Sequence, residues 1–116
     1  MEIVICPDAV AAGKLGAQAI VTLFGHKPDA VLGLATGSSP LVIYDELAAR
    51  CAAGEVSFAR ARGFTLDEYV GLPAEHPETY HNVIRRDFVN RVDFGPDAVH
   101  GPDGLADDIP AFCASY

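Results

Sequence analysis

Residues 30–39 read Ala-Val-Leu-Gly-Leu-Ala-Thr-Gly-Ser-Ser, and this stretch sets the expected fold class. Its first half has no polar side chain, which is typical of a central parallel strand covered on both faces. A short polar turn follows, and Pro40 comes next, at a position typical of the first turn of a helix. The pattern predicts a strand over 30–35 and a helix with Ser39 as its N-cap, which ends near Ala53, before Gly54.

The neighbouring segments continue this alternation. Residues 2–6 are a β-branched apolar run, typical of a first strand, and residues 9–25 carry apolar side chains at helical spacing after Asp8, a good N-cap residue. Residues 61–66 have the composition of a further strand. The order strand, helix, strand, helix, strand predicts a parallel α/β sheet with right-handed connections.

The remaining segments predict a helix from about residue 78 to 91, extended character near 98–100, and a helix that starts at 107–110. Within the first helix, Gly13 and Gly16 each weaken helix formation by about 1 kcal/mol relative to alanine. We therefore expect close packing against a sheet to compensate for them.

Composition narrows the class of protein. The chain has 116 residues, half of them hydrophobic, which is enough for one modest core in one domain or part of one. Its formal charge of -8 argues against nucleic-acid or anionic-membrane partners, and no apolar run reaches the roughly 20 residues of a bilayer span. The three scattered cysteines and four histidines predict neither a disulfide framework nor a metal site. A cytoplasmic protein that binds a small molecule is expected.

The end of the chain suggests an incomplete domain. A helix begins near residue 109, shortly before Tyr116. A three-stranded parallel sheet with so short a final helix would leave apolar edges and faces uncovered. We therefore expect the first part of a longer protein, or a chain that pairs with further copies.

Two polar features follow predicted strands: the turn at 36–39 and the adjacent carboxylates Asp67 and Glu68. Ligands bind at the carboxyl ends of parallel strands, and strands lie about 4.8 Å apart. The two features should therefore share one edge of the sheet, roughly 5 to 10 Å apart. This separation is comparable with the span of an open-chain sugar phosphate.

The turn suits a phosphate and the acidic pair suits a general base. Glycine allows close approach, while backbone N–H groups, hydroxyls and the following helix N-terminus favour an anion. The turn contains no Lys or Arg, so the positive charge that balances a phosphate would come from Arg85, Arg86 or residues beyond this chain. Side chains alternate on a strand, so only one of Asp67 and Glu68 should face the site, and the pattern leaves both open.

Three segments together resemble glucosamine-6-phosphate deaminase. They are Leu-Ala-Thr-Gly-Ser-Ser-Pro at 34–40, Phe-Thr-Leu-Asp-Glu-Tyr-Val-Gly-Leu-Pro at 64–73, and His-Pro-Glu-Thr-Tyr at 76–80. The resemblance covers residues 1–116, as the amino-terminal part of a single domain. The related 6-phosphogluconolactonases share the turn and the Asp-Glu pair, but are less similar after Glu68.

This resemblance implies a Rossmann-like α/β fold with a parallel sheet and helices on both faces. It also implies conversion of glucosamine 6-phosphate and water to fructose 6-phosphate and ammonia, in amino-sugar catabolism. The expected enzyme is a cytoplasmic hydrolase of C–N bonds that isomerises its substrate, needs no cofactor and forms a homo-oligomer. Its expected partner is a small-molecule sugar phosphate.

The resemblance also assigns site residues. Asp67 matches the acid that moves a proton between C2 and C1 of the opened sugar, which leaves Glu68 a supporting role. The expected substrate-binding residues are Thr36, Gly37, Ser38, Ser39 and Tyr80. The family's ring-opening Asp-x-His region does not occur in these residues. The alternatives are therefore a catalytically silent sugar-phosphate-binding or structural half-domain, or a 6-phosphogluconolactonase-like hydrolase.

Overall fold

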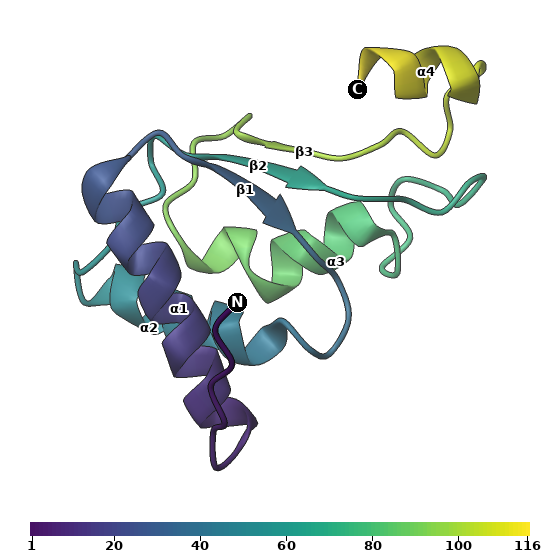
Figure 1. Ribbon diagram of the computed structural model, residues 1–116. Coiled ribbons are helices and arrows are strands. Elements are labelled where there is room, and N and C mark those ends of the chain that lie inside the picture. Colours follow the sequence, from purple (N-terminus) through teal and green to yellow (C-terminus); the bar gives the residue numbers. More distant parts are fainter.

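A three-stranded sheet and four α-helices make up the computed structural model, which describes residues 1–116 (Figure 1). In chain order the elements are α1 (Ala9–His26), β1 (Val31–Leu34), α2 (Leu41–Ala52), β2 (Arg62–Thr65), α3 (Tyr80–Asp87), the 3-10 helix η1 (Val89–Arg91), β3 (Val99–His100) and α4 (Ile109–Ser115).

All strand pairs in the sheet are parallel, in the order β1-β2-β3. Leu34 of β1 lies beside Thr65 of β2, and Gly63 of β2 lies beside Val99 of β3. The helices α1, α2 and α3 lie on one side of the sheet and α4 lies on the other (Figure 1). The predicted parallel α/β class, with helices on both faces, is confirmed.

The predicted strand over residues 2–6 is wrong, because residues 1–6 have no regular structure. Ile3 is 76% exposed and Ile5 is 94% exposed. A strand is stabilised by backbone hydrogen bonds to a neighbour and by burial of at least one face. The segment has neither in this structure, so its high β propensity has no effect.

Strand β1 is formed as predicted, but it lies at the edge of the sheet and not in its centre. Leu34 is 4% exposed and faces α1–α3, whereas Val31 on the opposite face is 47% exposed. The expectation that both faces of this strand are covered is therefore wrong. On β2, the ring of Phe64 lies 5.9 Å from the ring of Tyr116, so the far end of the chain covers part of the open face.

The hydrophobic core lies between the sheet and α1–α3 and includes twelve buried residues. Phe58 and Phe88 are fully buried at its centre, with ring centroids 5.6 Å apart. Tyr44 of α2 stacks on Phe88 at 4.5 Å, and Phe24 of α1 meets Phe58 edge-on at 5.0 Å. Aromatic side chains therefore join the three helices to the segment that precedes β2.

The start of α2 differs from the prediction. The N-cap is Pro40, with no side-chain cap, and Ser39 is exposed. The carbonyl of Pro40 accepts from the N–H of Tyr44 at 3.0 Å, and the N–H of Leu41 donates to the Ser38 carbonyl at 3.4 Å. Backbone groups thus form the first turn without the Ser39 hydroxyl. The predicted stop at Gly54 is confirmed, with a left-handed φ of 74°.

Helix α3 is shorter than predicted at both ends. It starts after Thr79, whose hydroxyl oxygen accepts from the Asn82 N–H at 3.2 Å. It ends at Asp87 because the backbone of Phe88 leaves the helical region, with φ at -142°. Burial of the Phe88 ring in the core accompanies this break, and the single turn of η1 follows.

The carboxylate of Asp93 joins the segment after η1 to the segment before β2. It accepts from the Ser57 hydroxyl at 2.6 Å, the Phe58 N–H at 2.6 Å and the Cys51 thiol at 3.4 Å. Burial alone would raise the pKa of Asp93, but the hydrogen bonds from Ser57, Phe58 and Cys51 outweigh it, and the pKa is lowered. These hydrogen bonds fix the position of Phe58 beside the core.

The last helix of the chain begins where the sequence predicts it. Helix α4 starts as expected, with the Asp108 carboxylate accepting from the Ala111 N–H at 2.9 Å. Cys6, Cys51 and Cys113 are free thiols. None of the helices combines the length and the apolar character that crossing a membrane requires.

The helices α1 and α2 approach closely at Gly13. A Cβ atom at Gly13 would lie 2.9 Å from both the Cβ and the carbonyl oxygen of Val42. The compensating contact expected for this glycine therefore exists, but it is made with α2 and not with the sheet.

We expect Gly13→Ala to lower the free energy of unfolding, because the new methyl group meets the α2 backbone. The overpacking cost of about 1–3 kcal/mol opposes a gain of about 1 kcal/mol in helix propensity. Gly25→Ala is the matched control, since a Cβ at Gly25 of α1 has no neighbour within 4 Å. Urea unfolding of both variants checks this, and greater stability in Gly13→Ala would contradict the close contact.

Candidate active site

The ends of β1 and β2 form one hollow at the edge of the sheet. Thr36 follows β1 and Asp67 follows β2, and both line a cavity of about 140 Å³. The parallel register places Leu34 and Thr65 side by side, so the segments that follow β1 and β2 leave the sheet at neighbouring positions. The structure thus brings together the turn and the carboxylate that the sequence placed on one edge.

Thr36 also lines a larger cavity of about 420 Å³. Thr36, Gly37 and Ser38 form one wall, and Tyr80 and Arg86 of α3 lie among the other lining residues. Thr36 is common to both cavities, so the predicted phosphate turn lies between α3 and Asp67. Of the predicted site residues, Ser39 alone lines neither cavity.

The turn at 36–39 contains a residue with an unusual backbone conformation. Gly37 has a φ of 98°, in the left-handed region that residues with a Cβ rarely adopt. The turn leads directly into α2, whose N-terminal N–H groups carry partial positive charge. The carbonyl of Ala35, the residue before the turn, accepts from the buried Tyr44 hydroxyl at 2.7 Å. Burial raises the pKa of Tyr44, so this hydroxyl remains a donor.

Tyr80 lies against a second tyrosine. Its ring centroid is 4.8 Å from that of Tyr69, and its hydroxyl donates to the Tyr69 oxygen at 3.4 Å. This hydrogen bond is the main reason that the pKa of Tyr80 is raised. The charge of Tyr69, burial and the charge of Asp67 raise this pKa further, while the Thr36 side chain lowers it. The pKa of the Tyr80 hydroxyl therefore depends on Thr36 of the turn and on Asp67, the candidate base.

The two arginines considered as counter-charge for a phosphate lie in different surroundings. Arg86 lines the larger cavity with the turn, and its Nε donates to Asp87 at 3.0 Å. Arg85 does not line that cavity, and its Nε donates to His81 Nε2 at 2.9 Å. Glu78 and Asp87 offset the charge of Arg86 there, so an anion would depend mainly on the hydroxyl and N–H groups of the turn.

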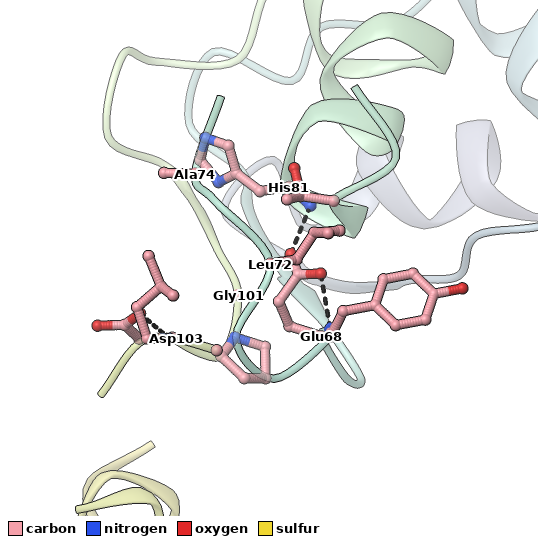
Figure 2. Close-up of a pocket in the computed structure, with 11 residues that line it drawn as sticks. Glu68, Leu72, Ala74, His81, Gly101 and Asp103 are labelled. Atoms are coloured by element: carbon pink, nitrogen blue, oxygen red, sulfur yellow. Dashed lines mark hydrogen bonds between the residues drawn. The ribbon is translucent and has the colours of Figure 1, made fainter. Parts of the chain in front are cut away.

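The two adjacent carboxylates have different environments. Glu68 accepts from three backbone N–H groups, those of Tyr69 at 2.8 Å and of Tyr80 and His81 at 2.9 Å. Figure 2 shows the contact with His81. Asp67 is exposed, and its carboxylate takes part in no hydrogen bond or ion pair within the chain. The structure thus distinguishes the two carboxylates by their contacts: Glu68 is held by backbone N–H groups, and Asp67 is not.

A further cavity of about 260 Å³ lies between the loops after β2 and β3 (Figure 2). Glu68, Leu72, His81 and Asp103 are among its lining residues, whereas Asp67 and the turn are not. No cluster of three or more His, Cys, Asp or Glu side chains with the arrangement of a metal site occurs in the chain.

The fold of the chain is similar to that of solved α/β proteins that include a deaminase and two lactonases. It matches a monomeric glucosamine-6-phosphate deaminase, described as a missing link of the NagB superfamily, with a TM-score of 0.94 and 34% identity over 100% of this chain and 48% of that one. A 6-phosphogluconolactonase from Thermotoga maritima matches over 90% of this chain and 47% of that one, with a TM-score of 0.66 and 22% identity. This second likeness concerns the fold alone.

The sequence relatives that match the chain at high identity are glucosamine-6-phosphate deaminases. The chain is 67% identical to glucosamine-6-phosphate deaminase of Mycolicibacterium smegmatis and 64% identical to that of Beutenbergia cavernae, each over 100% of this chain and 44% of the relative. No protein-family model matches the chain. The resemblance to glucosamine-6-phosphate deaminase is thus confirmed along the whole chain, which spans less than half the length of these relatives.

Proposed function

We propose that the full-length protein containing this chain converts glucosamine 6-phosphate and water to fructose 6-phosphate and ammonia. Residues 1–116 would be the amino-terminal part of its single domain. The observation that carries this proposal is the meeting of the Thr36–Ser38 turn with the free Asp67 carboxylate, in a chain 67% identical to a deaminase.

In this proposal the turn binds the phosphate. Thr36 and Ser38 offer hydroxyl and N–H donors, Gly37 allows close approach, and α2 adds the partial charge of its N-terminus. Ser39 extends the turn toward solvent and is retained as a phosphate-side residue. Arg86, and Tyr80 as a hydroxyl donor, face the same cavity from α3.

Asp67 then serves as the base for the carbon chemistry. It takes the proton from C2 of the open aldehyde form and returns a proton to C1. O1 gains a proton and the C2 amine loses one, so that C1 becomes a hydroxymethyl group and the amine becomes an imine. Water adds to C2 and ammonia leaves, so the product is the 2-ketose. C1 is reduced as C2 is oxidised within one molecule, so the reaction needs no external oxidant or reductant.

The proposal is tested by incubating the full-length protein with glucosamine 6-phosphate and measuring ammonia and fructose 6-phosphate. We expect both products in equal amounts. Hydrolysis of 6-phosphogluconolactone, together with no ammonia release from glucosamine 6-phosphate, would support the lactonase alternative and overturn the proposal. For residues 1–116 alone, phosphosugar binding without turnover would support the silent half-domain.

We also propose that the full-length enzyme is a cytoplasmic homo-oligomer. The support for this is the resemblance to the deaminase family, while the related deaminase described as monomeric makes a monomer the competing outcome. Light scattering of the purified full-length protein distinguishes the two states.

A further inference from the structure

Glu68 occupies an unusual position for a residue next to a candidate base. It follows Asp67 on the loop after β2, yet its carboxylate lies at the start of α3, twelve residues farther along the chain (Figure 2). One oxygen accepts from the N–H groups of both Tyr69 and Tyr80, and the other accepts from the N–H of His81. The side chain therefore connects the strand end to the helix.

The usual N-cap of α3 does not need this carboxylate. Thr79 already accepts from the Asn82 N–H, as an N-cap residue normally does. The Glu68 contacts instead satisfy two further N–H groups of the first turn, which otherwise have no intrahelical partner. Hydrogen bonds to a charged carboxylate are stronger than neutral ones, so the connection is well suited to fixing the helix start.

The connection determines where Tyr80 lies. Tyr80 is the first residue of α3, and its backbone N–H shares one Glu68 oxygen with the N–H of Tyr69. The two tyrosine rings then meet at 4.8 Å, and both line the cavity that contains Thr36. A displacement of the helix start relative to the loop would separate the two rings and move Tyr80 away from the turn.

We propose that Glu68 is a positioning residue that holds Tyr80 and Asp67 in one arrangement, by joining the loop after β2 to the first turn of α3. The consequence for catalysis rests on the proposed function, whereas the placement of Tyr80 does not. Glu68 itself does not touch the substrate in this proposal.

The informative variant is Glu68→Gln, which keeps the length of the side chain but loses its charge and one of its two acceptor oxygens. Glu68→Asp keeps the charge but is one methylene too short for the same reach. Asp93→Asn is the matched control, because the Asp93 carboxylate also accepts from three groups but lies in a different part of the fold. All variants are compared well below their unfolding temperatures.

The placement of Tyr80 is measured by the titration of its ring, followed by carbon NMR of labelled tyrosine, with Tyr80→Phe assigning the signal. In the wild type the pKa of Tyr80 is raised, mainly by the hydrogen bond with Tyr69. We expect this pKa to fall toward its ordinary value in Glu68→Gln and to stay unchanged in Asp93→Asn. An unchanged Tyr80 titration in Glu68→Gln would overturn the proposal, whether or not the protein is an active deaminase.

The catalytic consequence is measured on the full-length protein as separate kcat and KM values. We expect kcat of Glu68→Gln to fall by about 10- to 100-fold, as small misplacements of catalytic groups commonly cause, with Asp93→Asn close to wild type. A wild-type kcat in Glu68→Gln would contradict the role in positioning. Absence of ammonia release from the wild type would instead refute the proposed function, and the Tyr80 titration would still decide the placement.

Discussion

Asp67→Asn in the full-length protein is expected to reduce ammonia release from glucosamine 6-phosphate by about 10²- to 10⁴-fold, the usual contribution of a general base. Asparagine preserves the size of the side chain but cannot take a proton from C2. Because Asp67 is exposed and makes no hydrogen bond within the chain, the change should leave the fold and its stability unaltered. Steady-state kinetics and thermal unfolding of the same preparation check both statements.

The matched control for Asp67→Asn is Asp97→Asn, which removes another exposed carboxylate from a loop that lines none of the cavities described above. It should retain wild-type kinetics. Phosphosugar binding by Asp67→Asn should persist, since the turn that binds the phosphate is untouched. Wild-type turnover in Asp67→Asn would remove this residue from the mechanism.

Phe58→Ala is expected to lower the free energy of unfolding by about 3–5 kcal/mol, the typical cost of removing a buried phenylalanine ring. Phe58 is fully buried, and its ring lies 5.0 Å from Phe24, 5.6 Å from Phe88 and 5.3 Å from Phe94. Neighbouring rings cannot easily fill the space that it leaves. Unfolding in urea, followed by circular dichroism, measures the loss.

Phe112→Ala provides the comparison for Phe58→Ala, because Phe112 is only half-buried and belongs to α4, which has no buried residue. Its loss should be about 1 kcal/mol or less, as for most surface substitutions. Equal losses in the two variants would contradict the placement of the core between the sheet and α1–α3.

Local sequence patterns predict much of the fold. The helix over 9–25, the strands over 30–35 and 61–66, and the stop at Gly54 all follow from residue spacing and from breaker residues, and all are found within a few residues of the expected bounds. Such patterns report which face of an element is apolar, and the short connections then leave few ways to arrange the elements.

The errors arise where a contact between distant residues determines the backbone. Residues 2–6 have strand propensity but no neighbouring strand to pair with. Helix α3 stops at Asp87 although apolar spacing continues to Val89, because Phe88 turns into the core. The N-cap expected at Ser39 is not used, since the backbone of the turn already satisfies the start of α2.

In the candidate site, too, some features could be predicted from the sequence and others depend on contacts between residues distant in the chain. Its two main parts could be predicted because the topology of a parallel sheet brings the strand ends together, as found for Thr36 and Asp67. The contacts of Glu68 with α3 and of Tyr44 with the Ala35 carbonyl could not, because they join residues twelve and nine positions apart through no recognised local motif. The difference between the two carboxylates is therefore visible only in three dimensions.

Helix α4 is joined to the sheet chiefly through Tyr116, whose hydroxyl donates to the Thr65 carbonyl at 2.8 Å, and it contains no buried residue. Residues 1–6 likewise lie outside the core. Local unfolding of either end would expose little additional apolar surface and would therefore cost little free energy. Amide protons in these two segments should exchange with solvent rapidly, without unfolding of the whole protein. The segments that carry Thr36 and Tyr80 lead directly into α2 and α3, whose residues Tyr44 and Ile84 belong to the twelve-residue core, so amide protons of these two helices should exchange more slowly than those of either end.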